Sequence, residues 1–322
     1  MSEPTSASHI PVLLERVLEL LAPPVTGPFA NDRPVVVDAT LGLGGHAEAM
    51  LTRFDDLHVI GIDRDPEALA RAGRRLEPFG DRVTLAHAVY DEVEDVVRDA
   101  GFDAVSGVLF DLGVSSMQLD LAQRGFAYSQ DAPLDMRMNP DDDLTAADVL
   151  NTYAVGDLAR VLQVYGEEKF ARRIAAAVVA ARSDEPFTSS GRLVDLIRTS
   201  IPAAARRTGG NPAKRTFQAL RIEVNDELGA YERALPAALG VIEPGGRVVV
   251  LAYHSLEDRL TKRAFARVTT TDVPRDVPFV PEGHEPVFRL LTRGAEQAPD
   301  AETATNPRAR SVRLRAVERI AA

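Results

Sequence analysis

The amino-acid sequence predicts an α/β fold, a doubly wound and mostly parallel sheet into which an all-helical domain is inserted. The first observation is an alternation of short β-branched runs with helical stretches through residues 34–111, as in successive βαβ units. The second is the loss of this alternation between residues 115 and 211, where only helical periodicity is visible. We therefore expect three parts: a disordered tail at residues 1–8, a sheet-containing domain from residues 9–114 and 216–322, and an inserted helical domain at residues 115–215.

The elements before the insertion follow from apolar spacing and from proline positions. Residues 12–21 have apolar positions at helical spacing, and this helix should end before Pro23 and Pro24, which lack backbone donors. Pro66 suits the first position of a helix that continues through residues 67–76. The other elements expected here are a helix at residues 47–54 and strands at residues 34–38, 58–63, 82–86 and 104–111.

Helical periodicity also defines the insertion and the segment after it. The helices expected within the insertion cover residues 146–153, 155–165, 167–182 and 192–200. Residues 216–242 then predict one long amphipathic helix, which ends at Pro244 and the two glycines that follow it. The last expected elements are a strand at residues 247–253, a helix at residues 256–268, and a terminal strand pair at residues 287–292 and 311–318.

Composition excludes several classes of protein. The 322 residues include 37 Lys+Arg, 48 Asp+Glu and no Cys, so a disulfide scaffold, a thiolate zinc site and an Fe–S cluster are excluded. No apolar run approaches the ~20 residues that a membrane helix needs, and the N-terminus shows no signal peptide, so we expect a cytoplasmic protein. The net charge of −11 argues mildly against a nucleic-acid partner, although the placement of basic residues matters more than the sum.

The turn after the first predicted strand is rich in glycine. The strand ends at Asp38, and Gly42, Gly44 and Gly45 follow before the next helix. Glycines at such a turn let the backbone approach a ligand and leave helix N–H groups pointing at it. The second strand ends at Asp63, where a carboxylate can accept both hydroxyls of a ribose, or can instead cap the following helix. Loop and acid together indicate a nucleoside-cofactor site at the carboxyl ends of the strands.

Two cofactors fit this loop. Gly42, Gly44 and Ala47 have the spacing of the dinucleotide fingerprint, so an NAD-binding oxidoreductase is one interpretation. S-adenosyl-L-methionine is favoured because Asp38 precedes the glycines, where it can face a positively charged methionyl end. A further acid, Asp111, ends the fourth strand, although it can also cap a loop. The terminal strand pair suits a methyltransferase sheet better than a dehydrogenase.

Other polar clusters are better explained by local structure. Residues 141–143 are three aspartates ahead of a predicted helix, and their charge suits a helix N-terminus better than a metal site. Ser255, Glu257 and Asp258 are typical of a helix start, and adjacent His254 and Ser255 do not face each other as a catalytic dyad would. No histidine pair has metal-site spacing, so we expect no bound metal.

Ten ordered segments between residues 9 and 311 resemble a single protein family. They are HIPVLL (9–14), DATLGLGGH (38–46), IDRDP (62–66), DLGVSS (111–116), RGF (124–126), PLDMR (133–137), YGEEKF (165–170), RTFQALRI (215–222), HSLEDR (254–259) and NPRARS (306–311). The chain is similar in these segments to the ribosomal RNA small subunit methyltransferase H family, also called MraW. The resemblance implies a class I S-adenosylmethionine-dependent methyltransferase fold, and methylation of N4 of one specific cytidine in the decoding region of 16S rRNA.

The resemblance also implies a set of cofactor contacts, namely Gly44, Gly45, His46, Asp63, Tyr90, Asp111 and Gln118. The chain departs from the family at Tyr90 and Tyr253, where Phe is common, at Ala39, where Gly is common, and at Met117, where Pro is common. An aromatic ring at position 90 can still stack on adenine. Amino-methylating enzymes usually carry an acid or Asn before Pro-Pro-aromatic after the fourth strand, and here that place reads Asp111-Leu-Gly-Val. No catalytic residue is therefore assigned, and Asp111 is the weak candidate.

Basic residues near the end of the insertion are expected to contact RNA. Arg206, Arg207, Lys214 and Arg215 precede the return of the chain to the sheet domain, with a solvated surface as the alternative. We therefore expect the insertion to recognise the substrate, with the basic residues of segment 308–319 as the second choice. The expected partner is 16S rRNA in the small ribosomal subunit, and the oligomeric state is left open between monomer and homodimer. A non-catalytic RNA-binding assembly factor that keeps the same fold is the remaining interpretation.

Overall fold

The computed structural model describes residues 10–27, 31–203, 211–271 and 284–320. The chain divides into two compact units, which we call the sheet unit (Met1–Gly113 with Ala230–Ala322) and the helical unit (Val114–Gly229). The insertion expected to end at residue 215 thus differs from the helical unit, which continues to Gly229. The tail expected at residues 1–8 lies outside the described residues.

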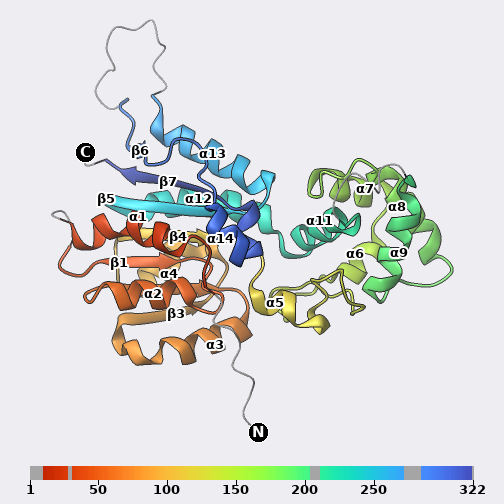
Figure 1. Ribbon diagram of the computed structural model, residues 1–322, viewed down its shortest axis with the longest axis horizontal. Helices are drawn as coiled ribbons and strands as arrows, with labels where there is room; N and C mark the ends of the chain where they lie inside the picture. The colour runs from red at the N-terminus through yellow and green to blue at the C-terminus, as the bar shows by residue number, and fades with distance from the viewer. Residues whose placement is uncertain (1–9, 28–30, 204–210, 272–283, 321–322) are drawn as a thin grey trace, which may run out of the picture. The chain divides into compact units, whose positions relative to one another are not determined.

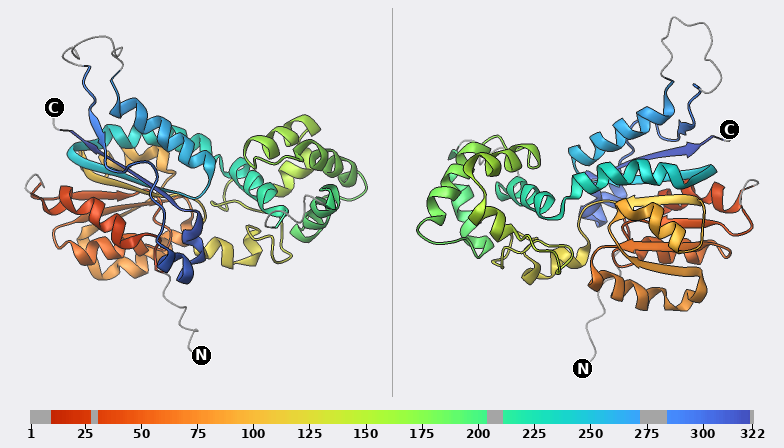
Figure 2. Two further views of the ribbon diagram at one scale, coloured as in Figure 1. Left: turned by 45° about the horizontal axis from the view of Figure 1, so that its top comes forward. Right: turned by 180° about the vertical axis from the view of Figure 1, so that it is seen from behind.

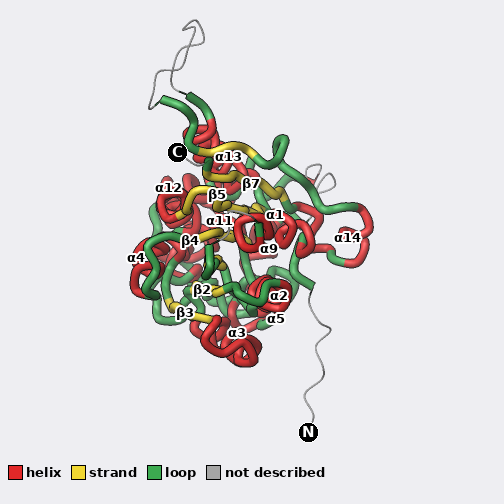
Figure 3. Tube along the Cα trace, turned by 90° about the vertical axis from the view of Figure 1, so that its left-hand side faces the viewer, coloured by secondary structure: helices red, strands yellow, loops and turns green. Residues whose placement is uncertain are grey.

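The described residues of the sheet unit form a seven-stranded sheet in the order β3-β2-β1-β4-β5-β7-β6. Strands β1 to β5 pair in parallel, and β7 is antiparallel to both of its neighbours. In Figure 3 these strands lie between two layers of helices. Their bounds are β1 (Val35–Asp38), β2 (His58–Asp63), β3 (Val83–His87), β4 (Val105–Asp111), β5 (Ile242–Ala252), β6 (Phe288–Leu290) and β7 (Arg313–Arg319). The predicted doubly wound sheet and its terminal strand pair are therefore confirmed.

Helices cover both faces of the sheet (Figure 1). Val36 of β1 belongs to the apolar cluster under one helix layer, whereas Val35 and Val37 belong to the cluster under the other. The strands can be apolar along their whole length because both faces are buried. The first layer contains α1 (Leu14–Thr26), α2 (Gly45–Arg53) and α3 (Pro66–Leu76), and the second contains α4 (Val93–Asp99), α12 (Glu227–Val241) and α13 (Ser255–Thr269). The shorter elements are α14 (Asp300–Thr305) and the 3-10 turns η1 (Glu77–Arg82), η2 (Tyr90–Glu92) and η4 (Pro307–Ser311).

Helix α1 continues through Pro23 and Pro24, so the prediction that it ends before them is wrong. A proline at position 24 leaves the Leu20 carbonyl without its helical donor. Arg247 on β5 supplies a replacement, because its Nη1 donates to the Leu20 carbonyl oxygen at 2.6 Å. Val25, beyond the prolines, stays buried against the sheet. Packing and one long-range hydrogen bond therefore sustain the last turn of the helix.

The described part of the helical unit consists of helices and loops, with an isolated β-bridge between Pro133 and Ser189. Figure 2 shows these helices in colours that run from yellow through green to teal. They enclose an apolar core of their own, which includes Leu158, Ile174 and Leu220. Their bounds are α5 (Ser116–Asp120), η3 (Ala122–Arg124), α6 (Ala146–Thr152), α7 (Val155–Val164), α8 (Ala171–Arg182), α9 (Ser190–Ser200) and α11 (Ala213–Asn225). Within the described ranges, no helix has the length and hydropathy that a bilayer crossing requires.

The single long helix predicted at residues 216–242 is wrong. Two helices, α11 and α12, occupy this segment, and they are separated at Asp226, whose φ of 46° lies in the left-handed region. Aspartate is among the few residues besides glycine that adopt this conformation at low cost. The strand that follows also begins earlier than expected, at Ile242, and its pairing with β4 shifts register as it passes Gly245 and Gly246.

Candidate functional site

Three carboxylates lie at the carboxyl ends of adjacent parallel strands. Asp38 ends β1, Asp63 ends β2 and Asp111 ends β4. Because β1 pairs in parallel with both β2 and β4, these ends share one edge of the sheet. Open α/β sheets bind their ligands at this edge. The structure thus brings together the acids that the sequence singled out.

The glycine turn after β1 is tied to the end of β2. Gly42 and Gly44 have φ values of 54° and 76°, which glycine adopts without strain. Asp63 Oδ2 accepts the Gly42 amide at 2.7 Å, and its Oδ1 accepts the Asp65 amide at 2.8 Å. Asp65 itself caps α3 by accepting the amide of Glu67 at 3.0 Å. The helix-capping role considered as the alternative for Asp63 therefore belongs to Asp65.

Helix α2 begins directly at this turn. Gly44 is its N-cap residue, and no side chain caps the first turn of the helix. A Cβ at Gly45 would lie 2.7 Å from Pro11 Cγ, so a side chain there would have to displace the proline ring. Uncapped first-turn amides are donors that a polar or anionic ligand group can use. The turn therefore has the open backbone that a bound nucleoside cofactor requires.

His46 and Tyr253 approach the carboxylate of Asp111 from two sides. The Tyr253 hydroxyl donates to Asp111 Oδ1 at 2.6 Å. His46 Nδ1 lies 3.6 Å from Asp111 Oδ2, and His46 Nε2 donates to the Val12 carbonyl at 3.1 Å. The backbone of Asp111 is also fixed, because its amide donates to Thr40 Oγ1 at 2.6 Å. Both the position and the orientation of this carboxylate are therefore defined by its neighbours.

The electrostatics of the site disfavour negative charge. Burial, followed by the charges of Asp111 and Asp63, raises the pKa of Asp38 to about 7, against a weaker opposing effect from the Thr40 amide. Burial also raises the pKa of Asp63 to about 6, although the amides of Asp65 and Gly42 oppose the shift. Carboxylates that resist ionisation together are stabilised by a positive ligand among them. The site is therefore electrostatically suited to a cation.

Tyr90 and Gln118, the two remaining predicted cofactor contacts, lie in different units. Tyr90 opens η2 after β3, and its partly buried ring meets the rings of Phe110 and Tyr231 edge-on, at centroid distances of 6.0 and 6.4 Å. Gln118 belongs to the helical unit, where it is buried on α5 and its Oε1 accepts the amide of Ser115 at 3.0 Å. The other predicted contacts all lie in the sheet unit.

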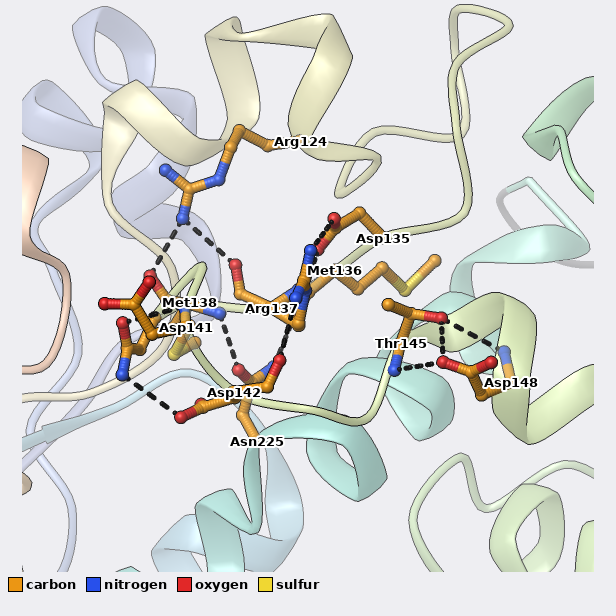
Figure 4. A network of polar contacts seen from close by, with 11 residues as sticks. Arg124, Asp135, Met136, Arg137, Met138, Asp141, Asp142, Thr145, Asp148 and Asn225 are labelled. Atoms are coloured by element: carbon orange, nitrogen blue, oxygen red, sulfur yellow. Dashed lines mark hydrogen bonds and ion pairs between the residues drawn. The ribbon is translucent and has the colours of Figure 1, made fainter.

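The loop of residues 124–138 in the helical unit is held by a polar network (Figure 4). Arg124 Nη2 donates to the carbonyls of Arg137 and Met138, at 3.0 and 2.8 Å. Met136 is buried with a φ of 61°, a conformation that costs energy for a residue with a side chain. Asn225 of α11 compensates, donating to the Met136 carbonyl and accepting the Met138 amide, at 2.8 and 2.7 Å. Sequence analysis missed Asn225, because no local pattern links residues so far apart.

The predicted RNA contacts are only partly described. Lys214 and Arg215 are exposed in the first turn of α11, and Arg215 Nη1 donates to the Glu167 carbonyl at 3.0 Å. Arg206 and Arg207 lie outside the described residues. In the second basic group, Arg313 and Arg315 both form ion pairs with Asp258, at 3.1 and 2.7 Å, and Arg319 donates to the Ile242 carbonyl. Structural contacts thus engage much of that second group.

The acidic segment 141–143 has local partners. Asp142 Oδ1 accepts from Asn139 Nδ2 at 3.1 Å. The N-cap of α6 is Thr145, which exchanges hydrogen bonds with Asp148. The predicted capping role of the three aspartates is therefore carried out by a later residue. In the described ranges, no group of three or more His, Cys, Asp or Glu side chains could hold a metal ion.

A doubly wound sheet with an antiparallel β7, a glycine turn after β1 and acids at the ends of β1, β2 and β4 defines a class I methyltransferase fold. The sequence model of the MraW methylase family matches residues 6–320, and the chain belongs to this family. The chain is 68% identical over 312 residues to a Nocardioides sp. protein named ribosomal RNA small subunit methyltransferase H, covering 97% of each chain. Proteins of the same name from Frankia alni and Streptomyces avermitilis are 63% and 58% identical, covering 97% and 98% of this chain and 95% and 98% of theirs.

Proposed function

We propose that this protein transfers a methyl group from S-adenosyl-L-methionine to N4 of one specific cytidine in the decoding region of 16S rRNA. The observation that carries the proposal is the set of three strand-end carboxylates, Asp38, Asp63 and Asp111, beside an uncapped helix N-terminus. The names of the relatives support the small ribosomal subunit as the substrate. Family membership favours methyl transfer over the NAD-dependent alternative.

The residues present fit S-adenosylmethionine. Acids whose charges repel one another suit its positively charged methionyl end. The amides after Gly44 and Gly45 suit its carboxylate, and Asp63 suits the hydroxyls of its ribose. The ring of Tyr90 suits a stacked adenine, because edge-on contacts with Phe110 and Tyr231 hold it in place. His46, Asp111 and Gln118 complete the proposed set.

The chemistry requires alignment more than activation. When bound, S-adenosylmethionine supplies a methyl group that the sulfonium has already activated. The protein must then place the N4 amine in line with the methyl group and exclude water. Holding the amine in this alignment lowers the entropic part of the barrier. As the bond from N4 to the methyl carbon forms, the bond from the sulfonium sulfur to that carbon would break, and the extra proton of the amine would pass to solvent as the product leaves. In this proposal Asp111 orients the amine by accepting a hydrogen bond from it.

The helical unit is the proposed substrate-recognition part. A cytidine within paired RNA is inaccessible, so the target base must be unpaired or extruded before reaction. Exposed Lys214 and Arg215 can neutralise phosphates while the base enters the site. In this proposal Arg206 and Arg207 extend the same basic segment.

One experiment tests the reaction and its rivals together. Small subunits from cells that lack this gene are incubated with the protein and labelled S-adenosylmethionine, and the modified nucleotide is mapped by mass spectrometry. Label on N4 of a single decoding-region cytidine supports the proposal. Binding of S-adenosylmethionine without transfer to any subunit or naked rRNA supports the assembly-factor alternative. A change in NADH fluorescence on mixing, without S-adenosylmethionine binding, supports the oxidoreductase.

A further inference from the structure

Tyr253 carries a hydroxyl group to the candidate site from the end of β5. Strands β4 and β5 are parallel neighbours with Asp111 opposite Leu251, so the residue after β5 lies beside the end of β4. The Tyr253 hydroxyl donates to Asp111 Oδ1 at 2.6 Å. Its backbone amide donates to Glu257 Oε2 at 2.7 Å. The tyrosine is thus anchored at the backbone while its hydroxyl addresses the carboxylate.

The hydrogen bond from Tyr253 is a short contact in a crowded acidic region. Asp111 Oδ2 faces His46 Nδ1 at 3.6 Å, which exceeds hydrogen-bonding distance. Burial, then the charge of Asp111, raises the pKa of the Tyr253 hydroxyl well above its ordinary value. The phenol therefore stays protonated and remains a donor through the physiological pH range.

Charged groups on four neighbouring elements act on this pair. They are Asp38 on β1, His46 on α2, Glu257 on α13 and Glu302 on α14, and Asp63 on β2 in turn acts on Asp38. Most are acids, and neighbouring negative charges favour the protonated form of a carboxyl group. A hydrogen bond donated to the ionised form has the opposite effect. A neutral phenol provides this bond without adding a cation, so the negative charge remains available to a positive ligand.

We propose that Tyr253 is a positioning residue, whose hydroxyl keeps the Asp111 carboxylate ionised and oriented toward the cationic end of the bound cofactor. The inference rests on the proposed function, because it takes Asp111 as a contact of S-adenosylmethionine. It assigns Tyr253 no contact with the reacting atoms. The hydroxyl acts through Asp111, so its effect depends on pH in a way that a packing role does not.

The test compares the pH dependence of S-adenosylmethionine affinity in the wild type and in Tyr253→Phe, by calorimetry from about pH 5.5 to 8.5. Because the ring and its packing are kept and Asp111 is ionised in both proteins near pH 8.5, the affinity of Tyr253→Phe there should stay within about threefold of wild type. The midpoint of the affinity loss on acidification should move up by about one to two pH units, the effect of losing a hydrogen bond to a charged group. Asp38 and Asp63 also titrate in this range, so the shift is read as the difference in affinity between the variant and wild type at each pH.

Tyr153→Phe is the matched control, because it also removes a hydroxyl that donates to a carboxylate, Glu223 Oε1 at 2.9 Å, but belongs to the helical unit. Its pH profile should match wild type. In an Asp111→Asn background, Tyr253→Phe should cause no further shift, because the hydroxyl acts through that carboxylate. An unshifted profile for Tyr253→Phe, or the same shift in Tyr153→Phe, overturns the inference. A wild-type protein that binds no S-adenosylmethionine at any pH overturns the proposed function instead.

Discussion

Asp63 and Gly42 are joined by a 2.7 Å hydrogen bond between the end of β2 and the glycine turn that follows β1. The other oxygen of Asp63 accepts the amide of Asp65 at 2.8 Å. The carboxylate is therefore oriented by the backbone before any ligand binds. Each carboxylate oxygen has two lone pairs, so acceptor capacity remains for ligand hydroxyls. Such preorganisation lowers the entropic cost of binding.

The first prediction concerns this carboxylate. Asp63→Ala should lower the affinity for S-adenosylmethionine roughly 10- to 150-fold, because hydrogen bonds to a charged group contribute about 1.5–3 kcal/mol and 1.4 kcal/mol is a factor of ten. Isothermal titration calorimetry measures the change. Asp131→Ala is the control, since Asp131 also accepts a backbone amide, that of Gly191 at 2.7 Å, but belongs to the helical unit. Unchanged affinity in a folded Asp63→Ala protein would remove Asp63 from the site.

The second prediction links Asp38 to stability. Its pKa is about 7 in the folded protein against an ordinary 3.8, so between these pH values the folded state holds a proton that the unfolded chain has released. The free energy of unfolding of the cofactor-free protein therefore falls as pH rises from about 4 to 7, and this loss is complete above pH 7. Asp38→Asn should remove the Asp38 share of this loss and leave that of Asp63, raising stability by on the order of a few kcal/mol near pH 8 and hardly at all near pH 4.

Differential scanning calorimetry at both pH values tests this prediction. The same variant should bind S-adenosylmethionine more weakly near pH 8, because a carboxylate facing the cation has been lost. Stability sacrificed at a binding site is a common compromise. Equal changes in melting temperature at the two pH values would show that Asp38 ionisation does not destabilise the folded protein.

Most of the sheet was predictable because buried parallel strands are apolar along their whole length, and β2 has the bounds expected from the sequence. The strand-end acids followed from the same boundaries. The continuation of α1 was not predictable, since Arg247, 227 residues away, supplies the donor for the Leu20 carbonyl. The break between α11 and α12 has a local cause, the left-handed conformation of Asp226. An Asn-Asp pair within a helical pattern therefore indicates a possible helix end.

The candidate site shows the same limit. The position of Asp63 and the glycine turn follow from local patterns, but the contact of Tyr253 with Asp111 spans 142 residues. Only the pairing of β4 with β5 brings these two side chains together. Asn225 and Met136 are likewise 89 residues apart. Side chains that organise a site from a distance are visible only once the strands and helices are in place.

The third prediction concerns Asn225. Asn225→Ala should destabilise the protein by about 2–4 kcal/mol, because it leaves the buried Met138 amide and the Met136 carbonyl without their side-chain partner. Asn225→Asp should be no milder, because it keeps an acceptor for the Met138 amide but buries a carboxylate oxygen against the Met136 and Arg221 carbonyls. Urea unfolding measures both. A clearly milder effect of Asn225→Asp would indicate that the bonds donated by the Asn225 amide group contribute little to holding the loop.

The fourth prediction concerns RNA recognition. Lys214 and Arg215 form an exposed Lys-Arg pair on α11. The control is Lys262 and Arg263, an exposed Lys-Arg pair on α13. Changing either pair to alanine removes the same charge, but from different helices. Changing Lys214 and Arg215 should weaken rRNA binding. The slope of log affinity against log salt concentration should also become shallower by about one to two, because each lost duplex phosphate contact contributes close to 0.9 and each single-strand contact less. The control pair should leave the slope unchanged. S-adenosylmethionine affinity should be unaffected in both variants, since neither changes a proposed cofactor contact. A parallel loss of both affinities would indicate damaged folding. An unchanged salt slope would instead move the recognition surface to the basic residues of segment 308–319.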